Sequence, residues 1–179
     1  MILDATCSVK RAWPKVADVR VDISPLARPD VVADCRHLPF ADSTFTEVYC
    51  DPPFNVYRTG TVRDLNIRSR EGAEYVRFSH FETYKEWLDF LRATDLEFAR
   101  VLIPSGLLHY KLPHGRRPDG SINGACISQA DLPLALHFER VHEETYMARG
   151  PFAAVAEARG FHRWPTYFVT LRNRKGDPT

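Results

Sequence analysis

The chain has 179 residues, of which 44% are hydrophobic and 26% are charged, a composition typical of one globular domain with a sizeable core. Its 24 basic residues nearly balance its 23 acidic residues, which excludes a nucleic-acid-coating protein and a disordered polyelectrolyte as descriptions of the whole chain. No apolar stretch reaches the roughly 18 residues of a membrane span, and the start, Met1-Ile2-Leu3-Asp4, does not have the pattern of a signal peptide. We therefore expect a single cytoplasmic domain over residues 1–179.

Short apolar runs separated by turn residues make up the first third of the chain: residues 2–3, 19–23, 31–34 and 47–51. Runs of this length that are rich in Val and Ile and do not alternate strictly are typical of strands buried on both faces of a parallel sheet. The connections between them are short and contain prolines, whereas a parallel crossover normally needs about a dozen residues or more. We therefore expect reduced helices on this half of the sheet.

These runs end in, or lead directly into, aspartates: Asp4, Asp22, Asp34 and Asp51. Open α/β sheets bind their ligands outside the carboxyl ends of the strands. The four carboxylates therefore predict a binding edge at that end of the sheet.

The second half of the chain begins with residues 55–80, which are polar and have no clear period. Such a segment predicts a mobile substrate loop, with Arg58, Arg63 and Arg68 as candidate phosphate contacts. A helix follows, because Thr83 and Glu86 form a capping box and apolar residues then recur on one face. That face comprises Tyr84, Trp87, Leu88, Leu91, Phe98 and Leu102.

Further elements are expected after this helix, which we expect to stop at the Pro-Ser-Gly of residues 104–106. Strands are predicted over residues 107–112, 138–147 and 167–172, with a loop over 113–125 and a short helix over 151–160 that starts at a proline and stops at a glycine. We assign Trp87 to the core and Lys111 to a solvated rim.

Cysteine and histidine spacing bears on metal binding. Cys7, Cys35, Cys50 and Cys126 form no C-x-x-C pair, and the 7 histidines are scattered. A thiol in or beside an apolar run usually packs as a small buried side chain. The sequence therefore predicts no metal site and no disulfide framework.

The most specific chemical signal is Asp51-Pro52-Pro53-Phe54, directly after a buried run. The prolines fix φ and remove two backbone donors, so the nearby carbonyls are rigid acceptors. Asp51 adds a carboxylate acceptor and Phe54 adds a flat apolar face. This set suits a planar ring that bears an exocyclic amino group, held by two acceptors and stacked on the phenyl ring.

With this motif the sequence resembles the class I S-adenosylmethionine-dependent methyltransferases that methylate exocyclic amino groups of nucleic-acid bases. Those enzymes have Asp, Asn or Ser followed by Pro-Pro-Tyr/Phe after their fourth strand. The resemblance implies a Rossmann-like α/β fold with a mostly parallel seven-stranded sheet and one antiparallel strand. It also implies catalytic roles for Asp51, Pro52, Pro53 and Phe54, and S-adenosylmethionine as cofactor.

The resemblance extends to the expected cofactor site. The segment Asp4-Ala5-Thr6-Cys7-Ser8 corresponds to the first strand and cofactor loop, while Lys10 and Trp13 are similar to residues of a phage-type subgroup. Asp22 corresponds to the acidic residue that meets the ribose, and Asp34, Cys35 and Arg36 to the segment that contacts the adenine. Ser8 stands where the family has glycine, and a side chain there disfavours a left-handed backbone.

The reaction that the resemblance implies is direct methyl transfer to adenine N6 or cytosine N4 of DNA or RNA. The side chain of Asp51 and the carbonyl of Pro52 would localise the lone pair of the amino nitrogen and stabilise its developing charge. A base inside a duplex must be flipped out to reach such a pocket. We expect no membrane partner, and a separate recognition subunit is one way for so short a chain to select a target sequence.

Two alternatives stay open beside this hypothesis. One is a methyltransferase of the same fold that acts on a small molecule or a protein. The other is a non-catalytic methyltransferase-like domain that binds nucleic acid or a partner, which the missing glycine at Ser8 favours.

Overall fold

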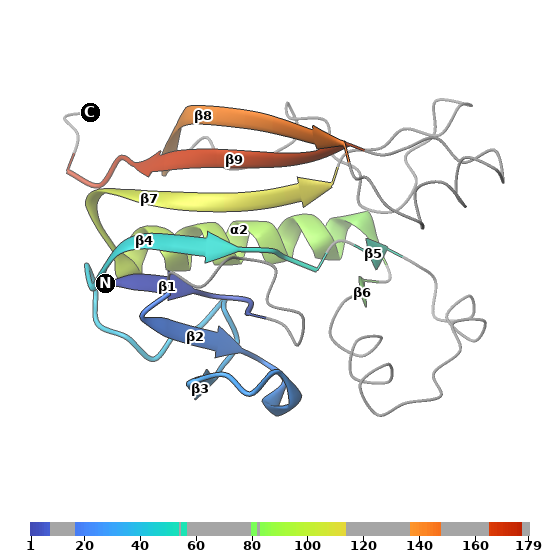
Figure 1. The fold of residues 1–179 in the computed structure, drawn as a ribbon, viewed down its shortest axis with the longest axis horizontal. Helices are drawn as coiled ribbons and strands as arrows, with labels where there is room; N and C mark the ends of the chain where they lie inside the picture. Colours follow the sequence, from blue (N-terminus) through green and yellow to red (C-terminus); the bar gives the residue numbers. More distant parts are fainter. Residues whose placement is uncertain are drawn as a thin grey trace, which may run out of the picture.

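The computed structural model of the protein describes residues 1–7, 17–53, 55–56, 80–81, 83–113, 137–147 and 165–176. A seven-stranded sheet runs through the molecule in the order β3-β2-β1-β4-β7-β9-β8 (Figure 1). Its strands are β1 (Ile2–Asp4), β2 (Val19–Asp22), β3 (Val31–Val32), β4 (Phe45–Cys50), β7 (Leu102–Pro113), β8 (Phe138–Met147) and β9 (Pro165–Asn173). The seven-stranded prediction is therefore confirmed.

Strand direction also follows the expectation. β1 lies inside the sheet, parallel to β2 on one side and to β4 on the other, and β7 is parallel to β4. β9 is antiparallel to both β7 and β8, so one reversed strand lies within an otherwise parallel sheet. The carboxyl ends of β1, β2, β4 and β7 point the same way, toward the right of Figure 1.

The N-terminal strands are short and contribute to the core. Leu3, Val21 and Val48 are completely inaccessible to solvent, but Val32 in β3 and Thr46 in β4 are exposed, so the prediction of strands buried on both faces is met only in part. Helical structure in the described residues before β4 is limited to one turn, η1 (Pro25–Ala27), which Ser24 caps through its side chain. The expectation of reduced helices is confirmed for residues 17–53.

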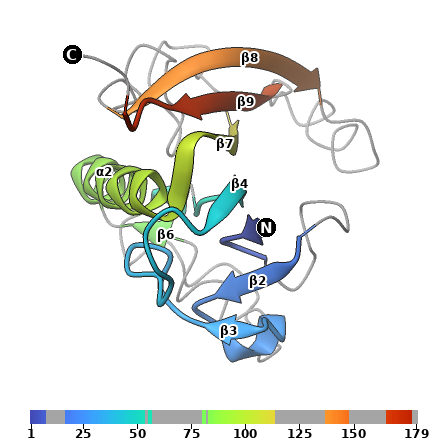
Figure 2. The same ribbon diagram turned by 90° about the vertical axis from the view of Figure 1, so that its left-hand side faces the viewer.

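Helix α2 (Tyr84–Val101) packs against one face of the sheet (Figure 2). Its N-cap is Thr83, whose hydroxyl accepts a hydrogen bond from the Glu86 N–H at 3.2 Å. On the face of α2 that packs on the sheet, Trp87, Leu91 and Phe98 are fully buried. The capping box and the apolar face therefore place this helix as predicted.

The predicted end of the helix was wrong. Helix α2 stops at Val101, and Leu102 already begins β7. The pairing of β4 with β7 jumps from Phe45 opposite Leu102 to Glu47 opposite Leu107, so the Pro-Ser-Gly of residues 104–106 forms a bulge inside the strand. A Cβ at Gly106 would lie 3.0 Å from the Ile103 carbonyl oxygen, which explains the glycine.

An ion-pair cluster on α2 holds the chain between β3 and β4. The Arg100 guanidinium donates to the carbonyls of Leu38 and Phe40 and to the carboxylates of Glu97 and Asp42. The segment between β3 and β4 is therefore a coil that Arg100 joins to α2, where a crossover helix would otherwise lie.

Several predictions concern residues outside the described ranges: most of the substrate loop with Arg58, Arg63 and Arg68, the loop after residue 113, the helix over 151–160 and Cys126. Two ends of the predicted substrate loop are described, and β5 (Asn55–Val56) pairs in parallel with β6 (His80–Phe81). Within the described part of the chain, no helix has the length and apolarity to cross a membrane.

Candidate functional site

Asp51 follows the last residue of β4, and the segment after β1 holds its backbone. The Asp51 N–H donates to the Thr6 hydroxyl at 2.7 Å, and the Ala5 N–H donates to the Tyr49 carbonyl at 2.9 Å. The predicted cofactor loop and the predicted catalytic motif therefore lie against each other at the carboxyl edge of the sheet.

The Asp51 side chain is engaged at one oxygen only. Its Oδ2 lies 2.6 Å from Lys111 Nζ, in an ion pair whose side chains are 14% and 27% exposed. Its Oδ1 is buried and has no hydrogen-bond partner among the described residues. Burial raises the pKa of Asp51, and the Lys111 ammonium opposes that shift.

Lys111 was wrongly assigned to a solvated rim. It lies 60 residues from Asp51 in the sequence, and only the pairing of β4 with β7 brings the two together. The sequence did offer one signal for this contact. Lys111 lies near the carboxyl end of a predicted strand, and the predicted aspartates lie at the same edge of the sheet.

Trp87 does more than fill the core. Its indole N–H donates to the Pro53 carbonyl oxygen at 2.9 Å, so helix α2 fixes the third residue of the motif. A buried tryptophan needs an acceptor for its N–H, and this requirement was the sequence signal for a polar role. Pro52 is buried and Pro53 is half-buried.

Asp4 is the buried acid of the site, with 3% of its surface exposed. Its carboxylate accepts a hydrogen bond from the Thr6 N–H at 3.3 Å. Burial raises the pKa of Asp4 to about 6, and the negative charges of Asp22 and Asp51 add to the shift, while Thr6 and Arg20 oppose it. The Asp4 carboxylate therefore lies close enough to feel the charges of Asp22 and Asp51, which follow the strands on either side of β1.

Asp22 ends β2 and shapes the turn that follows. Its carboxylate accepts a hydrogen bond from the Ser24 N–H at 2.9 Å. On the other side of the strand end, the Cys7 N–H donates to the Val21 carbonyl at 3.0 Å. The end of β2 is thereby joined to the segment after β1.

Asp34 forms a local clamp with Arg36. Its two carboxylate oxygens accept from the Arg36 side chain, and Oδ1 also accepts from the Arg36 N–H. Although burial works against it, these bonds hold the pKa of Asp34 below its ordinary value. The Arg36 guanidinium also lies 5.7 Å from the centre of the Phe90 ring on α2, a distance suited to a cation–π contact.

The described cysteines are all buried. Cys7, Cys35 and Cys50 form no disulfide bond within the described part of the chain. Burial raises the pKa of Cys35 to about 12, so its thiol stays protonated and unreactive. Among the described residues, no three His, Cys, Asp or Glu side chains are placed to hold a metal ion.

The predicted site residues thus gather at one edge of the sheet where they are described. These are Asp4, Ala5, Thr6, Cys7, Asp22, Asp34, Cys35, Arg36, Asp51, Pro52 and Pro53. Ser8, Lys10, Trp13 and Phe54 lie outside the described residues.

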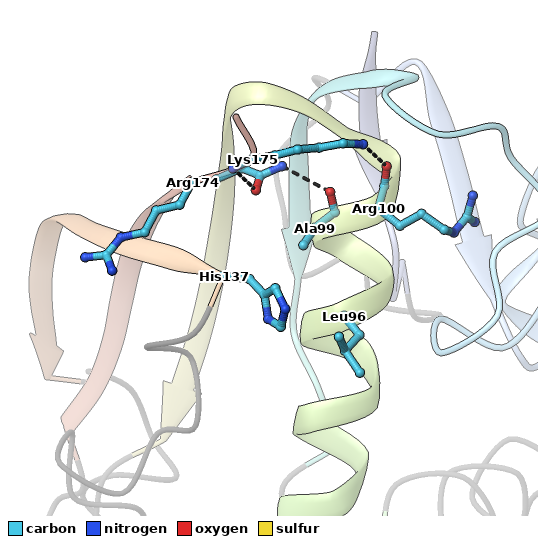
Figure 3. A pocket seen from close by; sticks show the side chains of 7 residues that line it. Leu96, Ala99, Arg100, His137, Arg174 and Lys175 are labelled. Carbon is cyan, nitrogen blue, oxygen red and sulfur yellow. Dashed lines mark hydrogen bonds between the residues drawn. The ribbon is translucent and has the colours of Figure 1, made fainter. Parts of the chain in front are cut away.

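A cavity of about 310 Å³ lies elsewhere, where α2 ends and β7 starts (Figure 3). Its lining residues are Leu96, Ala99, Arg100, His137, Asn173, Arg174 and Lys175. Asn173 donates to the Ala99 carbonyl at 3.1 Å, which closes the end of the helix. Since this cavity lies at the opposite end of the strands from Asp51, it is separate from the candidate site.

Comparison with solved structures identifies the fold. A SAM-dependent methyltransferase from Methanosarcina mazei superposes on 96% of this chain and 91% of its own, with a TM-score of 0.56 and 13% identity. The protein has the class I methyltransferase fold. No protein-family model matches the sequence, and no curated protein matches it significantly.

Other structures with this fold differ in what they do. A geranyl diphosphate methyltransferase, solved with geranyl diphosphate and sinefungin, matches with a TM-score of 0.56 and 9% identity over 97% of this chain and 70% of its own. The cyclase SpnF matches with a TM-score of 0.58 and 17% identity over 96% of this chain and 73% of its own. Because one fold hosts several reactions, the function must be argued from the site.

Proposed function

We propose that this protein transfers a methyl group from S-adenosylmethionine to an exocyclic amino group of a nucleic-acid base, either adenine N6 or cytosine N4. The observation that carries the proposal is the placement of Asp51, Pro52 and Pro53 at the carboxyl end of β4. The buried Oδ1 of Asp51 has no hydrogen-bond partner there among the described residues. An acceptor left in that state suits an N–H donor that arrives with the substrate.

The neighbouring carboxylates fit the cofactor. S-adenosylmethionine carries a sulfonium and an ammonium, and a bound cation would relieve the repulsion that Asp22 and Asp51 exert on the Asp4 carboxylate. In this proposal Asp22 accepts hydrogen bonds from the ribose hydroxyls. We assign the remaining cofactor contacts to residues 4–8 and 34–36, and to Lys10 and Trp13 as the sequence resemblance implies.

The chain's own residues then act on the amino group. When bound, the cofactor supplies an electrophilic methyl group. Asp51 Oδ1 and the Pro52 carbonyl accept the two N–H bonds, which draws the nitrogen toward a tetrahedral shape and localises its lone pair. The carboxylate stabilises the positive charge that develops on nitrogen, and the proton lost after methylation passes through it to solvent.

The nucleic-acid part of the proposal rests on the planar, amino-bearing ring that the motif suits. Such a base must leave the duplex or come from a single strand. We assign Phe54 to stacking on the flipped base and residues 55–80 to a loop that closes over the nucleotide, with the whole of residues 1–179 acting as one domain.

Two measurements test the proposal. Calorimetry with S-adenosylmethionine measures cofactor binding, and transfer of a labelled methyl group to single-stranded DNA, RNA and a panel of metabolites measures the reaction, with Asp51→Ala protein as control. Methylation of nucleic acid by the wild-type protein, but not by the Asp51→Ala protein, supports the proposal. Methylation confined to metabolites would assign the protein to the small-molecule class, and binding without any turnover would make it a non-catalytic domain.

A further inference from the structure

We propose that Lys111 is a positioning residue that holds Asp51 Oδ2, so that Oδ1 becomes the acceptor for the target amino group. This inference rests on the proposed function and deepens it, because it assigns separate tasks to the two oxygens of one carboxylate.

The sheet itself places the two residues. Cys50 pairs with Tyr110 across β4 and β7, so Asp51 and Lys111 are the next residues along the two parallel strands. Neighbouring strands place such residues on the same face of the sheet. The resulting distance from Nζ to Oδ2 is 2.6 Å, which is short even for a charge-assisted hydrogen bond between an ammonium and a carboxylate.

The surroundings of Asp51 are otherwise acidic. Among the described residues, the titratable groups that act on it or respond to it are Asp4 on β1, the adjacent Cys50 and Lys111 on β7. Lys111 supplies the only positive charge in this set. Without it, burial would favour the protonated form of Asp51 unopposed.

Protonation would disable the site in a defined way. A protonated carboxyl group carries an O–H donor and no longer neutralises a positive charge that develops nearby. Lys111 therefore keeps Asp51 ionised and fixes its rotamer, and it leaves Oδ1 and the Pro52 carbonyl as two acceptors for one NH₂ group.

The first test compares pH–rate profiles for single-turnover methylation by the wild type, Lys111→Met and Lys111→Arg. We expect the acid limb of Lys111→Met to move up by about one pH unit or more, the usual effect of removing an adjacent opposite charge. Lys111→Arg keeps a positive charge beside Asp51, so its acid limb should stay close to that of the wild type. In an Asp51→Asn background, Lys111→Met should cause no further loss, because no carboxylate remains to be ionised.

Two results would overturn the inference. One is a Lys111→Met profile that is lowered without any shift along the pH axis. The other is an equal loss from Lys111→Met in the wild-type and Asp51→Asn backgrounds. Lys85→Met is the matched control, because Lys85 forms an exposed ion pair with Asp89 on α2 and should leave the profile unchanged.

A second readout does not depend on activity. The Asp51 carboxyl carbon is followed by carbon-13 NMR during a pH titration of wild-type and Lys111→Met proteins. A midpoint that rises in the variant supports the role of Lys111 even if the wild type methylates no substrate, in which case only the proposed function fails. An unchanged midpoint overturns the role of Lys111 whatever the activity.

Discussion

The buried Asp4 carboxylate allows a quantitative prediction about stability and binding. Replacement by Asn removes the charge but keeps an oxygen that accepts from the Thr6 N–H. In the folded protein the pKa of Asp4 is raised from 3.8 to about 6, whereas the unfolded chain has the ordinary value. The folded state therefore holds this proton more tightly, and stability is lost as the pH rises from about 4 to 6.

The magnitude follows from the size of the shift. Each pKa unit corresponds to about 1.36 kcal/mol, so a shift of about two units corresponds to roughly 3 kcal/mol as an upper limit. Asp4→Asn protein at pH 7 should gain up to that amount in free energy of unfolding over the wild type. Most of the gain should be lost by pH 4, where the wild-type carboxyl is protonated in the folded state and partly protonated in the unfolded chain.

Urea denaturation at several pH values between 4 and 8 measures this difference, and other titrating groups cancel between the two proteins. Asp42→Asn serves as control, because Asp42 is exposed and paired with Arg100. The Arg100 hydrogen bond lowers the pKa of Asp42, so its removal should have the opposite sign. A stability difference for Asp4→Asn that does not depend on pH would refute the reasoning.

If the proposed function is correct, the same Asp4→Asn protein should bind S-adenosylmethionine more weakly, since it lacks one of the carboxylates assigned to the cationic cofactor. Calorimetry at pH 7 measures this, and a loss of about tenfold corresponds to about 1.4 kcal/mol. Unchanged affinity in a folded, stabilised variant would place the cofactor away from Asp4.

Three further predictions concern the motif and the bulge. Asp51→Ala should spare cofactor affinity and slow single-turnover methylation by about 10²–10³, with Asp51→Asn less harmed; equal rates in all three proteins would place the chemistry elsewhere. Trp87→Phe removes a hydrogen bond to the motif, so urea denaturation should show a loss of about 0.5–1.5 kcal/mol, and turnover should fall more than cofactor affinity. Gly106→Ala forces a Cβ to within 3.0 Å of the Ile103 carbonyl oxygen, so the unfolding free energy should drop by about 1–3 kcal/mol; a stable variant would show that the bulge can relax.

Local patterns in the sequence determined most of the elements. The Val- and Ile-rich runs predicted the buried strands, and Thr83 with Glu86 predicted the start of α2, because burial and capping depend on residues a few positions apart. The end of α2 was not predictable in this way. Residues 104–106 have the composition of a turn, but the pairing of β7 with β4 stabilises them as a bulge within the strand.

The candidate site was likewise predictable from the sequence only in part. The sequence by itself indicated that Asp4, Asp22 and Asp51 lie at the carboxyl ends of strands, because each follows a buried apolar run. Only the tertiary structure decided what those acids contact. The partners of the motif, Lys111 and Trp87, lie 60 and 34 residues from Asp51 and Pro53 respectively, and strand register and helix packing bring them to bonding distance. Such contacts depend on the pairing of distant segments, which local periodicity does not encode.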